Sequence, residues 1–167
     1  MAGLTLTVDS RVCSNERPAV DLTDSRVRLE WLLLADSAEV VNNKLYVLGG
    51  GWEIYMRNGP APVKFAIAAS FQVPWNATNQ KHAFEIQVVN EDAQQKLLGF
   101  GGEFEVGRPP GLPAGSGQRT QFAMNGDADL VPASYAVRCL LDGEQQDRQL
   151  SFRVVGGPQY APPLAGG

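Results

Sequence analysis

The sequence predicts an all-β fold, an antiparallel β-sandwich of two packed sheets with about eight or nine strands. Between residues 27 and 155, apolar and polar side chains alternate with a period of two, as in strands buried on one face. Glycine (18) and proline (11) are abundant among the 167 residues, and turn signals recur between the alternating runs. The one helical candidate, residues 35–41, is too short to be stable alone. These observations favour sheets over helices.

Strands are expected in the first half of the chain wherever apolar residues alternate between turn signals. Asn42 and Asn43 predict a hairpin, because asparagine tolerates the positive φ of a tight turn. Three glycines, residues 49–51, end the second strand of that hairpin. The expected strands are, in order, 27–33, 39–41, 44–48, 52–55 and 65–73.

In the second half, a Pro/Gly-rich loop at residues 107–118 divides the expected strands, which are 84–88, a strand ending at 103–106, 119–124, 135–141 and 150–154. Residues 125–129 are expected to form an acidic turn, and Asp142-Gly143-Glu144 joins the last two strands. Tyr135 opens a strand after a turn, as the tyrosine corner of immunoglobulin-like sandwiches does. An immunoglobulin-like variant is therefore expected, with a tyrosine that only fills the core edge as the alternative.

Three segments are expected: an N-terminal arm (1–26), the β-sandwich domain (27–155) and a flexible Pro/Gly-rich tail (156–167). Within the arm, Leu4–Val8 is the stretch that alternates like a short strand. Ordering a backbone costs roughly 1–2 kcal/mol per residue, and both ends offer little apolar surface to offset that cost. The side chains expected between the two sheets are Trp31, Leu33, Phe65, Ile67, Phe71, Phe84, Ile86, Val137, Phe152 and Val154.

Charge and targeting signals narrow the function classes. The formal net charge is −4 and the basic residues are dispersed, so we expect no nucleic-acid partner. No apolar run is long enough for a membrane span, and no membrane partner is expected. The first residues lack the pattern of a secretion signal, which favours the cytoplasm or a virion as the location.

The chain offers little for catalysis. Its one histidine, His82, opens a strand without a nucleophile motif near it. Cys13 and Cys139 are far apart, so neither a disulfide nor a zinc site is expected, and Cys139 is expected to be a small buried residue. Residues 125–129 lack the ligand spacing of a calcium loop. The sequence therefore predicts no enzyme, no metal and no cofactor.

Two loop segments carry the candidate binding residues. Val73–His82 places a tryptophan in a connection between strands, and Arg108 stands before two prolines at the start of the long loop. Loop tryptophans and arginines often mark contact surfaces. Trp75, Asn79, His82 and Arg108 are thus candidates for binding a ligand or partner. The alternative is structural: Trp75 caps one end of the core and the prolines shape a connection.

The same segments resemble a bacterial protein family of unknown function, over about residues 29–155. The resemblance rests on Leu33-Leu-Ala-Asp36, Lys44-Leu-Tyr-Val-Leu-Gly-Gly-Gly-Trp52, Val73-Pro-Trp75…Thr78-Asn79…His82, Phe104-Glu-Val-Gly-Arg-Pro-Pro-Gly111 and Leu141-Asp-Gly-Glu144. It implies a compact β-domain and carries no known activity. Members of that family usually begin near the Leu33–Asp36 strand, so the N-terminal arm and the tail depart from it.

Two functional hypotheses follow. The first is a non-catalytic structural or interaction protein whose terminal arms contact protein subunits, for example a decoration protein in a phage capsid, with a homo-oligomer as one form of that assembly. The second is a cytoplasmic small-ligand-binding or enzyme-accessory domain, in which Trp75, Asn79, His82 and Arg108 line a pocket at the loop end.

Overall fold

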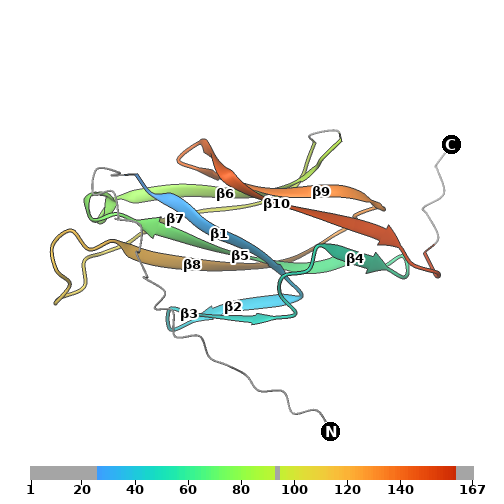
Figure 1. The fold of residues 1–167 in the computed structure, drawn as a ribbon, viewed down its shortest axis with the longest axis horizontal. Coiled ribbons are helices and arrows are strands. Elements are labelled where there is room, and N and C mark those ends of the chain that lie inside the picture. The colour runs from blue at the N-terminus through green and yellow to red at the C-terminus, as the bar shows by residue number, and fades with distance from the viewer. Residues whose placement is uncertain (1–25, 93–94, 161–167) are drawn as a thin grey trace, which may run out of the picture.

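The computed structural model describes residues 26–92 and 95–160 of the chain, and within them it is an all-β protein (Figure 1). Residues 1–25 of the expected arm, residues 161–167 of the expected tail, and the strand-like stretch Leu4–Val8 and Cys13 in the arm lie outside the described residues. A 3₁₀ turn, η1 (Trp75–Ala77), lies between β5 and β6. The strands are β1 (Arg28–Ala35), β2 (Ser37–Val41), β3 (Lys44–Leu48), β4 (Ile54–Arg57), β5 (Val63–Val73), β6 (Lys81–Asn90), β7 (Lys96–Glu105), β8 (Gln118–Ala128), β9 (Ala133–Leu141) and β10 (Glu144–Gly156).

Ten strands in the described residues correct the expected eight or nine. Each of the ten strands overlaps one of the alternating stretches expected above, and Asp36, the Asn42-Asn43 turn and the glycines at 49–51 separate the first four. Asn42 (φ 51°) and Asn43 (φ 60°) adopt the left-handed conformation that a two-residue hairpin requires, which confirms the predicted turn.

The strands form three sheets, ordered β1-β5-β8, β4-β10-β9-β6-β7 and β2-β3. All described pairs are antiparallel except β4 with β10, which is parallel and corrects the expectation of a wholly antiparallel fold. The reason lies in residues 49–53, which cross between the two larger sheets before β4 begins. Gly51 N donates to Leu34 O of β1 (2.7 Å), and Arg153 N of β10 donates to Glu53 O (2.8 Å).

One apolar core takes side chains from both larger sheets, as the burial of one face of each sheet predicts. Phe71 of β5 is fully buried, and β5 is covered on both faces over most of its length. Eight of the ten expected core residues are buried: Phe65, Ile67, Phe71, Phe84, Ile86, Val137, Phe152 and Val154.

Trp31 and Leu33 are wrong predictions for this core. The pairing of β1 with β5 shifts register between Leu29 and Trp31, a β-bulge that inserts one residue. Because strand side chains alternate between faces, the bulge turns Leu32 and Leu34 inward and sends Trp31 and Leu33 to the opposite face. There they pack beside a second, smaller cluster formed by Ala35, Ala38, Ala66 and Ala68.

The β2–β3 hairpin lies against this outer face and is fastened by Asn125 of β8. The Asn125 amide accepts from Ala38 N (3.1 Å) and donates to Ala38 O (2.7 Å), so it pairs like a strand backbone. The acidic turn expected at residues 125–129 is therefore wrong for most of its length. β8 continues to Ala128 because it pairs with β5 as far as Val63.

Two buried residues stabilise β9. The Tyr135 side chain is buried, and its hydroxyl donates to Val131 O (2.6 Å), four residues upstream. Cys139 is fully buried, as expected, and burial raises the pKa of its thiol to about 12. A thiol with this pKa stays protonated and unreactive at neutral pH.

No helix in residues 26–92 and 95–160 is long and apolar enough to cross a membrane.

Candidate functional site

The predicted site residues lie at one end of the molecule, where the β5–β6 and β7–β8 connections come together (Figure 1). Pro74 ends β5, the turn η1 carries Trp75, and residues 106–117 form the long loop after β7. Proline cannot donate a backbone hydrogen bond, so the chain leaves the sheet at this point.

Arg108 joins the two connections. Its Nε donates to Thr78 Oγ1 (2.6 Å) and its Nη2 donates to Trp75 O (3.0 Å). The guanidinium also lies 4.3 Å from the centre of the Trp75 ring, a cation–π contact. Thr78 Oγ1 in turn donates to Trp75 O (2.7 Å). Arg108 and Trp75 therefore act as a pair that fixes the long loop against η1.

Asn79 contributes through its backbone. Its φ is +58°, a left-handed conformation that asparagine adopts more readily than most residues. Its N–H donates to Val106 O (2.8 Å), which ties the turn after η1 to the end of β7.

His82 is 7% exposed, and both of its ring nitrogens are engaged. Nδ1 lies 2.9 Å from Asp142 Oδ2, and Nε2 lies 2.9 Å from Ala77 O. A backbone carbonyl and a carboxylate are both acceptors, so the geometry favours a ring with protons on both nitrogens. The ring also packs against Phe104, with centroids 5.6 Å apart.

The pKa of His82 is set by opposing effects. Burial lowers it, but the hydrogen bond to Asp142, the hydrogen bond to Ala77 O and the charge of Asp142 together outweigh burial and raise it above the ordinary 6.5. When both ring nitrogens donate to these two acceptors, as the geometry favours, the ring has no lone pair to take a proton from a substrate. His82 is thus suited to holding loops together, and poorly suited to act as a general base.

Asp142 is the residue that sequence reasoning treated only as part of a turn. With Gly143 it forms the β9–β10 hairpin turn, at φ values of 50° and 85°. Its Oδ1 accepts from Ala83 N (2.8 Å), and its own N–H donates to Ala83 O (2.7 Å). The Asp-Gly pair predicts the turn, but only the pairing of β6 with β9 brings it to His82.

The structure thus gathers all four candidates into one group of contacts, extended by Ala77, Thr78 and Asp142. We name this group, comprising Trp75, Thr78, Asn79, His82, Arg108 and Asp142, the loop clip. Its polar contacts described above join its members to one another or to backbone atoms of Ala77, Ala83 and Val106, so it fastens the β5–β6, β7–β8 and β9–β10 connections to one another.

Beside the loop clip is an open pocket of about 480 Å³, lined by Arg108, Arg119, Gln118 and Asn43 among others. Arg119 is paired with the Glu30 carboxylate, and the hydrogen bond from Arg119 holds the pKa of Glu30 below its usual value. Within the described ranges, no group of three or more His, Cys, Asp or Glu side chains is placed to hold a metal ion.

Comparison with known proteins now identifies the family. The sequence profile of a family of unknown function, DUF6941, matches residues 30–155. The chain belongs to this family. The match runs from within β1 through nearly all of β10 and includes the loop clip, in agreement with the family resemblance of the sequence.

No curated protein matches the chain significantly. Among solved structures, it is similar to the Pseudomonas fluorescens alkylpurine DNA glycosylase AlkC bound to DNA containing an abasic site analog, with 14% sequence identity and a TM-score of 0.39. The similarity covers 78% of this chain and 30% of the glycosylase chain.

The hydrogen bonds of His82 predict a pH dependence of stability. Because the folded-state pKa is raised above 6.5, the folded protein holds its proton more tightly than the unfolded chain does. This stabilisation is complete below about pH 6.5 and is lost as the pH rises through the folded pKa. Urea unfolding should therefore give a larger free energy of unfolding at pH 6 than at pH 8.

His82→Asn provides the control, because His82 is the one histidine in the chain. The variant should show a flatter dependence between pH 6 and pH 8. An equal slope in the variant and the parent would mean that another group, and not His82, titrates in this window.

Proposed function

We propose that this chain is a non-catalytic structural or interaction protein that acts through protein contacts in a larger assembly, such as a decoration protein of a phage capsid. The observation that carries the proposal is a set of large apolar side chains exposed on two adjacent segments of the chain. Tyr46 (52%) and Leu48 (70%) lie on β3, and Ile54 (65%) and Met56 (58%) lie on β4. Exposed apolar residues that gather on strands are typical of contact surfaces.

The position of these strands also supports contact. β4 is an edge strand of the five-stranded sheet, and β3 has β2 as its one partner among the described strands. Edge strands present unpaired backbone groups that can bind another chain. Tyr46 and Leu48 share one face of β3, and Ile54 and Met56 share one face of β4, so each strand directs an apolar face outward.

The internal contacts of the loop clip favour the non-catalytic alternative. His82 and Arg108, the side chains best suited to chemistry, bind backbone and side-chain atoms of neighbouring loops. We propose protein subunits as partners, contacted also by the terminal arms and including further copies of this chain. The expected location remains the cytoplasm or a virion, with neither nucleic acid nor membrane as partner.

The pocket beside Arg108 favours a second candidate, binding of a small ligand. Its volume of about 480 Å³ is within the range of small-molecule sites, and Arg108 would attract an anionic group. In this alternative the domain is a ligand-binding or enzyme-accessory unit.

For the fold, we propose that the two larger sheets form an immunoglobulin-like sandwich. The support is the hydrogen bond from the Tyr135 hydroxyl to Val131 O, the arrangement of a tyrosine corner.

The contact surface is tested by a double substitution, Leu48→Asp with Ile54→Asp. Both side chains are largely exposed, so the melting temperature should change little, whereas charges in an apolar contact should abolish association between copies. In sedimentation velocity at tens of micromolar, the parent should sediment as an oligomer and the variant as a monomer.

Gln145→Asp is the control for added charge, since it places one negative charge, against the two of the double variant, at an exposed polar position of β10. It should leave sedimentation unchanged. A parent chain that remains monomeric up to about 1 mM, a concentration at which even weak contacts of about 4 kcal/mol associate, would contradict contact between copies.

A further inference from the structure

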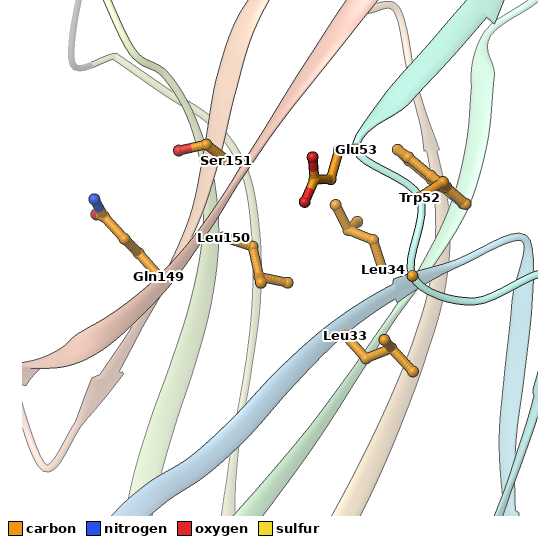
Figure 2. A pocket seen from close by; sticks show the side chains of 8 residues that line it. Leu33, Leu34, Trp52, Glu53, Gln149, Leu150 and Ser151 are labelled. Carbon is orange, nitrogen blue, oxygen red and sulfur yellow. The ribbon is translucent and has the colours of Figure 1, made fainter.

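A cavity of about 400 Å³ lies at the side of the core, between β1 and β10 (Figure 2). Leu33, Leu34, Trp52 and Leu150 give it an apolar lining, and we name it the β1–β10 slot. Figure 2 shows Leu150 directed toward the leucines of β1, whereas the side chains of its neighbours Gln149 and Ser151 point to the other side of β10.

Hydrogen bonds tie the two sheets together at each end of the slot. At one end, Leu29 N of β1 donates to Gln146 Oε1 of β10 (3.2 Å). At the other end, residues 51–53 bridge from β1 to β10 through their backbone. The slot is therefore bounded along both strands and at both ends, and it lies beside the edge of β10.

The edge of β10 has backbone groups available beside the slot. The pairing of β4 with β10 begins at Arg153, whose N–H donates to Glu53 O. Because backbone N–H groups alternate in direction along a strand, those of Ser151 and Gln149 point to the same edge as that of Arg153. None of the described strands pairs with β10 on this edge before Arg153.

The chain itself contains a segment of matching pattern. Leu4–Val8 alternates leucine or valine with threonine, so as a strand it would have one apolar face and one polar face. Seventeen residues separate Val8 from Arg26 (26 − 8 − 1) and can span up to about 56 Å when extended. The first described residue, Arg26, lies beside the start of β10, because its Nη1 is 3.7 Å from Glu144 Oε2. The segment before it therefore enters the described structure next to the strand that borders the slot.

We propose that Leu4–Val8 binds the β1–β10 slot as an added strand, paired with the edge of β10 at Gln149 and Ser151. Its leucines and valine face the apolar lining, and its threonines face solvent. This is β-strand addition, in which backbone hydrogen bonds give affinity and alternate side chains give specificity. This binding mode deepens the proposed function and rests on it, because the proposed function already has the N-terminal arm acting through contacts.

The experiment is amide hydrogen exchange on the full chain, followed by NMR, with two substitutions in the arm. Leu6→Asp places a charge on the apolar face of the segment, and Thr7→Asp places the same charge on its polar face. In the parent and in Thr7→Asp, the amides of Gln149 and Ser151 should exchange at least about tenfold more slowly than in Leu6→Asp. The Arg153 amide, already bonded to Glu53, reports that the domain remains folded.

Rapid exchange of the Gln149 and Ser151 amides in the parent would overturn the proposal, as would equal exchange in all three proteins. Protection that does not vary with protein concentration would assign the added strand to the same chain, and protection that rises with concentration would assign it to a neighbouring copy. Either result supports binding of Leu4–Val8 in the β1–β10 slot. If the parent forms oligomers while these amides stay unprotected, binding of Leu4–Val8 in the slot would be contradicted, and the proposed function through protein contacts would not. A monomer in which Leu6→Asp removes protection would support the slot and contradict contact between copies.

Discussion

Replacing Phe71 by alanine is expected to lower the free energy of unfolding by about 3–5 kcal/mol, a large part of the stability of a domain of this size. Phe71 is fully buried near the end of β5. Its ring centroid lies 5.4 Å from that of Phe84, 5.3 Å from Phe104 and 5.8 Å from Phe122, so three rings lose contacts together. These neighbours belong to β6, β7 and β8 and cannot all move in to fill the cavity.

Urea unfolding followed by circular dichroism measures the change, and Leu97→Ala is the control. Leu97 lies on β7 and is 42% exposed, so its truncation should cost less than about 1 kcal/mol. A loss below about 1 kcal/mol for Phe71→Ala would contradict the packing of both larger sheets on one core.

Local patterns were sufficient for the strands and for the hairpin turns. The alternation of residues 65–73 predicted the central strand, because one face of a strand must be apolar to pack on a core. Asn42-Asn43 predicted the first hairpin, since few residues other than asparagine and glycine adopt its backbone conformation. Such signals depend on neighbouring residues alone.

Features that depend on pairing between distant strands could not be predicted in this way. The bulge after Leu29 exists because β1 shifts against β5, and no residue in β1 marks it. Its consequence is the exchange of Leu32 and Leu34 for Trp31 and Leu33 on the core face. Likewise, the parallel pairing of β4 depends on the path of residues 49–53 between two sheets.

The candidate site also combines residues that local patterns predict with one that depends on pairing between distant strands. Trp75, Asn79, His82 and Arg108 were predicted from residue type and loop position, and the structure brings them together. Asp142 lies 60 residues from His82 in sequence. Its place beside the histidine follows from the β6–β9 ladder, which a single sequence does not reveal.

Arg57 is the clearest residue that no sequence pattern singled out, and its loss should have the second-largest effect. It is 5% exposed at the end of β4. Its guanidinium donates to the carbonyls of Gly59 (3.1 Å), Pro60 (3.0 Å) and Leu130 (2.8 Å) and to Asp129 Oδ1 (2.6 Å). One side chain thus fastens the turn after β4 to the connection between β8 and β9.

Arg57→Met keeps the length of the side chain and removes every donor, and it should lower the free energy of unfolding by about 2–4 kcal/mol. Most of this cost comes from carbonyls left without a donor, above all that of Leu130, whose residue is 1% exposed. The ion pair with Asp129 contributes little, because the Asp129 side chain is 71% exposed and solvent screens its charge. Asp129→Asn should therefore cost far less than Arg57→Met.

Arg153→Met is the matched control, since Arg153 is an exposed arginine on β10 that pairs with β4. It should change stability by no more than about 0.5 kcal/mol. If Arg57→Met and Arg153→Met lowered the free energy of unfolding equally little, water would have to replace the guanidinium as the donor to the carbonyls around residue 57. The Arg57 side chain would then not be what joins these two turns.

Arg57→Lys separates charge from geometry, because a lysine keeps the charge but cannot reach several carbonyls with a planar fork of donors. A stability close to that of Arg57→Met would show that the directed hydrogen bonds, and not the charge, stabilise this end of β4.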